Sequence, residues 1–437
     1  MEEAYPIAAA LEMLRGKVLY RDIWFDKPPL FPAFYATFGA AVGWKLRLAG
    51  SLLVSFSSVT AFWLARRLWS SKEGFWAAGL LAFFLTFGIP SAVLAVAPDM
   101  LMIAPHLLAL LFCVRKQPLF AGVASGIAML INAKGAFVLA ACIAWDWRSA
   151  QWILLGAAAA QLPVLSWMAW QGSLRAYWDQ VWVWGFSYSA DPPFDSPASE
   201  GVRRTMNWLG FQLGIVFAAA AALMNLKKPL QRSALFWLAI SFVAVMAGWR
   251  FFPRYYFHLL TPMCIFAARG ICTMGKARFV TFALMLIPLI RFSPGYVERA
   301  RGLPTIDLAL HDDAVRAVEI VKTLKPKSIM VWGYRPEIYA YSRIPAGTPF
   351  LDSQPLTGVL ADRHLTQVKP TFPALAKENR RKLTTYWPEV IVDGLAPMNL
   401  QLGLGYYPDL QDWRNYYVGV TRIENCAIYV LRNRERP

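Results

Sequence analysis

The chain has little charge and little cysteine. Only 16% of its 437 residues are charged, whereas 57% are hydrophobic and the mean hydropathy is +0.38. A soluble globular domain carries about 25% charged residues, so most of this chain is expected to lie in a membrane. Four of the five cysteines lie inside apolar segments, which leaves no disulfide framework.

Several motifs of soluble enzymes and of ATP-driven transporters are missing. The sequence has no Walker loop, no G-x-S-x-G elbow, no zinc-ligand spacing and no heptad run. ATP-driven transport and serine hydrolysis therefore have no support in the sequence. The 44 Lys and Arg outnumber the 27 Asp and Glu, but they cluster at the ends of apolar runs. We interpret these cations as topology determinants and phosphate ligands, and expect no nucleic-acid partner.

Long apolar runs recur between Trp44 and Ile290. A membrane span needs roughly 17–25 such residues, because an α-helix rises 1.5 Å per residue across a hydrocarbon core of about 30 Å. The runs predict about ten spans, of which the fourth and fifth are short: 46–68, 73–92, 98–115, 118–133, 134–147, 150–170, 206–225, 232–250, 255–274 and 278–292.

The loops between these runs alternate in charge. Lys and Arg occur in every second loop, at residues 66–72, 115–116, 148, 227–232 and 276–278. Cytoplasmic loops are enriched in these residues, so we expect this face to be cytoplasmic. The other loops and the C-terminal region then face the periplasm or the cell exterior, as in a multi-pass protein of the bacterial inner membrane.

Residues 1–45 are expected on the outer face as a first external loop. Segments 6–15 and 30–43 are apolar on one face but too short to cross a bilayer, so we expect two helices lying in the outer interface. The segment has no signal peptide, and we therefore expect a further helix upstream of Glu2, lost through a start codon assigned too far downstream. The alternative is a short N-terminus of mixed charge that crosses unaided.

The pattern changes at about Pro294 to that of a soluble α/β unit. Residues 307–324 have helical period, while 328–334, 389–395 and 427–433 resemble buried strands. The predicted fold class is thus a polytopic α-helical membrane protein with a C-terminal external α/β domain. The expected parts are the loop 1–45, a membrane region 46–293 and the domain 294–437.

The window 1–30 brings carboxylates and a cation to the outer rim. It contains Glu2, Glu3, Asp26 and Lys27, the last followed by two prolines that stiffen the backbone. A carboxylate can take a proton from an attacking hydroxyl, and an ammonium group is suited to a phosphate. The alternative is an ordinary charged interfacial loop.

Two further ionisable residues interrupt apolar segments. Asp99 begins a span on the outer side, where it is either a helix cap or part of the same aqueous rim. Lys134 lies among apolar residues between two short segments, which is costly unless the ammonium group is paired or lines a polar cavity. We favour a functional role for Lys134.

A third cluster lies at residues 248–262, at an outer membrane edge. Arginine can bind phosphate through two parallel hydrogen bonds, and tyrosines can stack on a sugar or line a lipid tail. The cluster contains Arg250, Arg254, Tyr255, Tyr256 and His258, and the alternative is an aromatic and basic membrane anchor. We interpret His106, which lies mid-span, as a packed polar residue.

Six motifs in order give the chain a resemblance. They are E-E-A-Y, A-x-x-M-L-R-G-K-V-L-Y-R-D-I-W-F-D-K-P-P-L, G-W-K-L-R-L-A, A-P-D-M-L-M, N-A-K-G-A and P-R-Y-Y-F-H-L-L-T-P. In this order they resemble the C-type integral-membrane glycosyltransferases, with the bacterial aminoarabinose transferases and protein mannosyltransferases as nearest kin. The similarity covers most of residues 1–275.

The resemblance implies transfer of a sugar from a polyprenyl-phosphate carrier on the outer membrane face, with inversion at the anomeric carbon. The family's Asp-Glu pair, whose first member is the base, falls on Glu2 and Glu3, so Glu replaces Asp here. Lys27 matches a phosphate ligand, and Asp99 a residue that orients the acceptor or assists the base. Lys134, Arg254 and Tyr255 match positions that line the same cavity.

The sequence therefore predicts a membrane glycosyltransferase with a polyprenyl-phosphate sugar donor, an unidentified acceptor and the lipid bilayer as partners. The expected catalytic residues are Glu2, Glu3 and Asp99, and the expected substrate-binding residues are Asp26, Lys27, Lys134, Arg254, Tyr255, Tyr256 and His258. No cofactor is predicted, since a divalent metal is compatible with such a reaction but no ligand pattern indicates one. The alternatives are a transporter or flippase of lipid-linked substrates and a non-catalytic membrane assembly protein.

Overall fold

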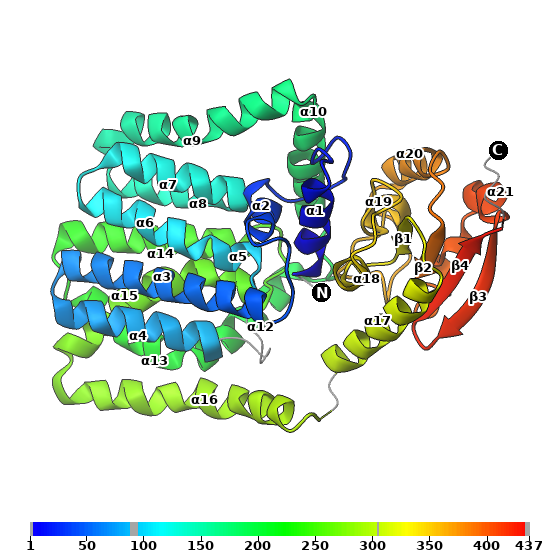
Figure 1. Cartoon of the computed structure of the whole chain (residues 1–437). Helices are drawn as coiled ribbons and strands as arrows, with labels where there is room; N and C mark the ends of the chain where they lie inside the picture. Colours follow the sequence, from blue (N-terminus) through cyan, green and yellow to red (C-terminus); the bar gives the residue numbers. More distant parts are fainter. Residues whose placement is uncertain (1–2, 88–94, 304–305, 433–437) are drawn as a thin grey trace.

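The computed structural model describes residues 3–87, 95–303 and 306–432. It consists of a bundle of roughly parallel and antiparallel helices, beyond one end of which lies a smaller unit that contains the sheet (Figure 1). The N-terminal helix lies between these two parts, close to the start of the C-terminal unit.

A helix occupies the position of each predicted span within the described residues. The bundle helices are α3 Trp44–Leu68, α4 Ser71–Phe87, α5 Pro98–Leu101, α6 Ile103–Val114, α7 Pro118–Ile131, α8 Gly135–Trp145, α9 Ala150–Trp170, α12 Pro197–Phe211, α13 Leu213–Met224, α14 Lys228–Met246, α15 Phe257–Thr273 and α16 Arg278–Ala300. Helix α16 continues past the boundary expected at residue 294. The end of the predicted span 73–92 lies outside the described residues.

By length and composition alone, four stretches of the described helices could cross a membrane. They are Trp44–Leu68, Trp147–Trp170, Lys228–Met246 and Gly275–Glu298, and a fifth arises if the pair α12 and α13, bent by 87°, counts as one span. The other bundle helices are shorter, so the number of ten spans stays a prediction.

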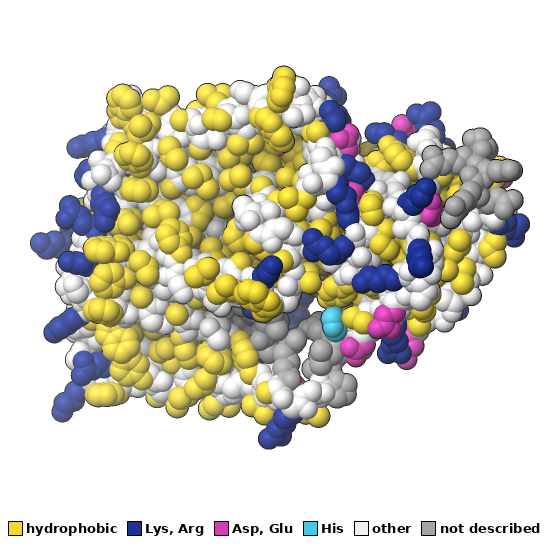
Figure 2. All heavy atoms as spheres, in the orientation of Figure 1, with side chains coloured by type: hydrophobic (Ala, Val, Ile, Leu, Met, Phe, Trp, Pro, Cys, Tyr) yellow, Lys and Arg dark blue, Asp and Glu magenta, His cyan; other side chains and the backbone are white. Residues whose placement is uncertain are grey.

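The surface of the bundle separates apolar from basic side chains. Large apolar side chains such as Leu52, Phe56 and Ile290 are more than half exposed along its flank, as lipid contact requires (Figure 2). Lys and Arg gather at the end of the bundle that lies away from the sheet unit. The turns after α3 and α6 and before α14 and α16 carry these cations, as the alternating loops predict.

The first loop, which precedes α3, contains two helices, α1 Ala4–Leu14 and α2 Leu30–Ala36. The prediction of helices that lie in the interface on one apolar face is wrong for α1, because every residue from Ala4 to Glu12 is buried. Helix α1 packs on α2 and on α18 Glu337–Ser342 of the C-terminal unit. The first loop is thus enclosed between the bundle and the C-terminal unit.

A long connecting segment joins α9 to α12. It forms α10 Leu174–Tyr177, a π-helical turn η2 Trp178–Val183 and α11 Trp184–Ala190. These three pieces run transverse to the bundle helices, beside α1 (Figure 1). Tight 3₁₀ turns complete the bundle at η1 Trp147–Ser149, η3 Pro253–Tyr256 and η4 Gly275–Ala277.

The C-terminal unit holds a four-stranded sheet in the order β1-β2-β4-β3. Strands β1 Ile329–Trp332 and β2 Val390–Asp393 are parallel and fully buried, whereas β4 Cys426–Leu431 runs antiparallel to β2 and to β3 Tyr417–Ile423. The helix and three strands expected in this region are present, while β3, whose residues are mostly exposed, was not expected. The remaining elements are α17 Ile306–Thr323, α19 Gln354–Thr357, α20 Pro373–Leu383, α21 Gln411–Arg414, η5 Leu400–Leu402, η6 Leu404–Tyr406 and η7 Pro408–Leu410.

Candidate active site

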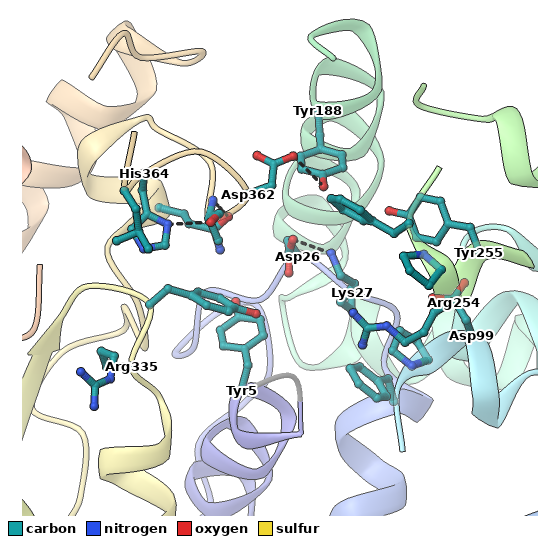
Figure 3. Close-up of a pocket in the computed structure, with 18 of the residues that line it drawn as sticks. Tyr5, Asp26, Lys27, Asp99, Tyr188, Arg254, Tyr255, Arg335, Asp362 and His364 are labelled. Carbon is teal, nitrogen blue, oxygen red and sulfur yellow. Dashed lines mark hydrogen bonds and ion pairs between the residues drawn. The ribbon is translucent and has the colours of Figure 1, made fainter. Parts of the chain in front are cut away.

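A cavity of about 570 Å³ lies where the bundle, the first loop and the C-terminal unit meet (Figure 3). This volume is in the range of sites that bind small molecules. The loop contributes Tyr5, Asp26, Lys27 and Phe31; the bundle side contributes Pro98, Asp99, Tyr188, Phe252, Pro253, Arg254 and Tyr255; and the C-terminal unit contributes Leu310, Tyr334, Arg335, Gln354, Ala361, Asp362, His364, Leu365, Gly394 and Met398.

Asp26 and Lys27 form an ion pair at the centre of this view. Lys27 Nζ lies 2.6 Å from Asp26 Oδ2, and the Lys27 side chain is 43% exposed, which leaves its ammonium group open to a ligand. The Tyr20 hydroxyl donates to the carbonyl of Lys27 at 2.7 Å, and Pro28 and Pro29 follow directly before α2. The loop therefore holds the ammonium group at a fixed place on the cavity wall.

Asp99 belongs to a second group, built from α5 and the break between α7 and α8. Asn132 Nδ2 donates to Asp99 Oδ1 at 3.1 Å, and the amide of Lys134 donates to Asn132 Oδ1 at 3.0 Å. The break needs a glycine, since a Cβ on Gly135 would lie 2.3 Å from the nitrogen of Met129. Asp99 lines the cavity, held by a side chain from the N-A-K-G motif.

Lys134 contacts a residue of the cavity lining from the side that faces away from the cavity. Its Nζ lies 3.1 Å from the centroid of the Tyr255 ring, and Tyr255 itself lines the cavity beside Arg254. An ammonium group over an aromatic ring is attracted by the ring's quadrupole. Lys134 is therefore placed as a support of Tyr255 and not on the lining itself.

Arg250 fixes the turn that carries Arg254 and Tyr255. Its buried guanidinium donates to Asp362 Oδ2 at 2.7 Å and to the carbonyls of Tyr188, Gly248 and Asp191 at 2.8, 3.0 and 2.9 Å. The same guanidinium lies 3.4 Å from the centroid of the Tyr188 ring. One arginine thus joins the bundle, the α11 segment and the C-terminal unit.

Besides Lys134, three of the expected site residues lie away from the cavity lining. Glu3 pairs with Arg47 and accepts from the amide of Val96 at 2.7 Å, so its carboxylate is engaged in fixing α1. Tyr256 is buried, stacks on Trp208 and shares a hydrogen bond with Thr205. His258 is buried beside His106, at 5.9 Å between ring centroids. Glu2 lies outside the described residues.

His106 was expected to be a packed polar residue, and the structure confirms this. The ring is buried, and its Nε2 accepts a hydrogen bond from Trp237 Nε1 at 2.8 Å.

The C-terminal unit supplies about half of the lining, and none of these residues was expected. Tyr334 follows the buried strand β1, and Asp362 and His364 lie in a loop after α19. Asp352 is buried behind the lining, where burial and the nearby Asp26 raise the pKa of its carboxyl to about 7. In the sequence, these residues could have been found only as polar residues that follow predicted buried strands. Because they are far in sequence from residues 1–30, nothing indicated that they share a cavity with Asp26 and Lys27.

No group of three or more His, Cys, Asp or Glu able to hold a metal ion occurs among residues 3–87, 95–303 and 306–432. The lining combines three cations, Lys27, Arg254 and Arg335, with carboxylates and several tyrosine hydroxyls, and Arg335 is paired with Asp313 and Glu337. Cations of this kind suit a phosphate, and tyrosines suit the hydroxyls and faces of a sugar.

No protein-family model and no curated protein matches the chain. Solved structures of low sequence identity share its fold. The crystal structure of ArnT from Cupriavidus metallidurans bound to undecaprenyl phosphate is 15% identical with a TM-score of 0.64, and the match covers 98% of this chain and 93% of that one. The crystal structure of ArnT in the apo state is 14% identical with a TM-score of 0.63, and the match again covers 98% of this chain and 93% of that one.

A third match is the apo oligosaccharyltransferase from Archaeoglobus fulgidus, at 12% identity and a TM-score of 0.50, over 96% of this chain and 69% of that one. ArnT is an aminoarabinose transferase, and both enzymes are C-type membrane glycosyltransferases. The resemblance given by the six motifs is thus confirmed at the level of the fold.

Proposed function

We propose that this protein is a membrane glycosyltransferase that moves a sugar from a polyprenyl-phosphate carrier to an acceptor on the extracytoplasmic side, with inversion. The observation that carries the proposal is the cavity in which Lys27 and Arg254 lie close to Asp99 and to a set of tyrosines, at the end of the apolar bundle that meets the C-terminal unit. The shared fold with ArnT, crystallised with undecaprenyl phosphate, supports the choice of donor.

A donor on a lipid carrier cannot leave the membrane, so its phosphate has to be bound where the bundle ends. Lys27 comes from the first loop and Arg254 from the η3 turn, and both line the cavity. Cations at these two places offset the charge that builds on the phosphate as the sugar departs. Tyr255, supported by Lys134, lies between this phosphate site and the bundle core.

The reaction is a single displacement. An acceptor hydroxyl oxygen attacks the anomeric carbon, the carbon–oxygen bond to the phosphate breaks, and its electron pair leaves with the polyprenyl phosphate. The proton of the hydroxyl passes to a carboxylate. Among the described residues we assign this role to Asp99, because Asp26 is paired with Lys27 and Glu3 with Arg47.

The test is transfer of a radiolabelled sugar from undecaprenyl phosphate to membrane acceptors, with the full chain in vesicles. Replacement of one transition-state donor typically costs about 10²–10³ in rate, so Lys27→Ala should reduce transfer by roughly that factor. Lys45→Ala is the matched control, because Lys45 is an exposed cation near the same end of the bundle that does not line the cavity.

Undiminished transfer by Lys27→Ala would remove the phosphate role. A transporter or flippase would instead move the labelled lipid between leaflets and form no new glycosidic bond. Product analysis by mass spectrometry separates these two outcomes, since only the transferase yields free undecaprenyl phosphate together with a glycosylated acceptor.

A further inference from the structure

His364 occupies the wall of the cavity that the C-terminal unit builds. Figure 3 shows its ring on the far side of the cavity from Lys27, Arg254 and Asp99, with the Asp26 carboxylate between them. The phosphate site and the catalytic carboxylate proposed above therefore lie on one side, and His364 lies on the other.

The protonation of the His364 ring follows from its hydrogen bond. Nδ1 lies 2.7 Å from the carbonyl oxygen of Ala361, which can only accept, so Nδ1 carries the hydrogen. Burial lowers the pKa of the imidazole, and the ring is neutral at pH 7. Nε2 is then an acceptor with a free lone pair, and it makes no hydrogen bond to the residues that the structure describes.

The loop around His364 is held from several directions. Asn399 Nδ2 donates to the His364 carbonyl at 2.9 Å, and the His364 amide donates to Leu360 at 3.0 Å. The neighbouring Arg363 donates to the carbonyl of Asp191 at 2.7 Å. These hydrogen bonds hold the backbone of the loop in place, and they therefore orient the His364 ring before a ligand binds.

The rim beside His364 is open. Leu365 is 46% exposed and Met398 is 36% exposed, and both also line the cavity. A donor anchored in the bilayer reaches the cavity from the bundle, so the open rim on the C-terminal unit is the approach for the second substrate. His364 is the polar side chain at that approach.

We propose that His364 Nε2 accepts a hydrogen bond from an O–H or N–H group of the acceptor and so orients the acceptor for attack on the donor. The inference rests on the transferase function proposed above and adds an acceptor-binding residue on the C-terminal unit. The group recognised is a neutral hydrogen-bond donor beside the attacking hydroxyl, because Asp99 receives the proton of that hydroxyl.

Two substitutions separate this role from a merely structural one. An asparagine side chain places its amide nitrogen near the position of Nδ1, so His364→Asn keeps the bond to Ala361 but loses the acceptor at Nε2. A glutamine side chain reaches the position of Nε2, so His364→Gln keeps an acceptor there but loses the anchor. If His364 binds the acceptor, the glutamine variant should be the more active of the two. If its role is only structural, the asparagine variant should be the more active.

The experiment uses the full chain in proteoliposomes with a radiolabelled sugar on undecaprenyl phosphate. Vesicles from cells that lack the gene supply the acceptor in increasing amounts. We expect His364→Asn to raise the acceptor concentration needed for half-maximal rate by about threefold to tenfold, the loss of one hydrogen bond. We expect His364→Gln to stay within about twofold of the unchanged protein, and slow hydrolysis of the donor by water to be equal in all three.

His311→Asn is the control, because His311 is an exposed histidine of the same unit outside the cavity lining. The reverse order, with the glutamine variant impaired and the asparagine variant normal, would assign His364 a structural role. A changed KM for donor hydrolysis in His364→Asn would show that His364 binds the sugar of the donor, and it would also overturn the proposal. If the unchanged protein transfers no label at all, the transferase function itself fails, an outcome distinct from both.

Discussion

At the scale of single residues, ion pairs decide which carboxylates are available. Glu3 and Asp26 form ion pairs with Arg47 and Lys27, whereas Asp99 accepts a hydrogen bond from the neutral amide of Asn132, and Lys134 and Lys27 act on it only from beyond ion-pair distance. A carboxylate already matched by a cation is a weaker base than one that is not. The resemblance in sequence points to the start of the chain for the base, and among the described residues the contacts favour Asp99.

Asp99→Asn gives the sharpest test of that choice. The amide keeps the shape of the side chain and its contact with Asn132 but cannot take a proton, so transfer should fall by about 10²–10⁴. Binding of undecaprenyl phosphate, measured separately on the purified protein, should change little. Glu3→Gln should lower the Tm but reduce the rate of transfer less than Asp99→Asn does. A larger loss of rate in Glu3→Gln than in Asp99→Asn would contradict the assignment.

Asp352 makes stability depend on pH. Its pKa is raised to about 7 in the folded protein by burial and by Asp26, so between pH 4 and 7 the folded state binds more protons than the unfolded state. Stability contributed by this carboxyl is full below pH 4 and is lost as pH rises toward 7, at roughly 1.4 kcal/mol per pH unit at most.

Asp352→Asn should remove that dependence while keeping the bond from the amide of Gln354, now 2.7 Å from Oδ1. Thermal unfolding of the two proteins at pH 5 and pH 7.5 measures the difference. The difference in Tm between Asp352→Asn and the unchanged protein should be larger at pH 7.5 than at pH 5. An equal difference at both pH values would show that the Asp352 carboxyl does not titrate in this range.

At the scale of elements, glycines let the bundle helices approach each other closely. A Cβ on Gly122 of α7 would lie 2.0 Å from the carbonyl oxygen of Ile153, and one on Gly156 of α9 would lie 2.0 Å from that of Leu119. Small residues at such crossings are the usual means of helix association in membranes, where lipid is as apolar as the side chains. Sequence periodicity finds these helices but does not show which faces meet.

Gly122→Ala should therefore destabilise the protein by about 1–3 kcal/mol, because the backbones of α7 and α9 have to separate. Gly79→Ala in α4 is the matched control, since nothing lies within 4 Å of its added Cβ, and it should be neutral. The measurement is the Tm of the purified proteins in detergent. Equal values for both variants would show that the two helices can part at no cost.

At the scale of the whole molecule, the first loop binds the C-terminal unit to the bundle. Trp24 packs edge-on against Trp184, and Trp184 stacks on Phe372 of the C-terminal unit at 4.0 Å between centroids. Glu12 is buried at the same junction, where it pairs with Lys17 at 2.5 Å and accepts from the amide of Ala346 at 3.1 Å. The cavity exists because these contacts hold three parts of the chain together.

Glu12→Ala should loosen this junction, because it leaves the buried amide of Ala346 without its acceptor, which costs about 1–3 kcal/mol. We expect faster proteolytic release of the C-terminal unit, together with reduced sugar transfer. Glu319→Ala, an exposed carboxylate on α17, serves as the control and should be cut at the unchanged rate. Equal cutting of both variants would show that the junction does not depend on Glu12.

Hydrophobic runs, basic loops and buried strands are local patterns, and from them the sequence alone determined the helix positions, the cationic end of the bundle and the α/β character of the C-terminal unit. The motifs also located Asp26, Lys27, Asp99, Arg254 and Tyr255, all of which line one cavity. Only the tertiary structure decided that α1 is buried on all sides, that Glu3 is bound by Arg47, and that Asp362 and His364 complete the lining. These depend on contacts between different elements of the chain, which composition and periodicity do not encode, since both describe the neighbourhood along the chain.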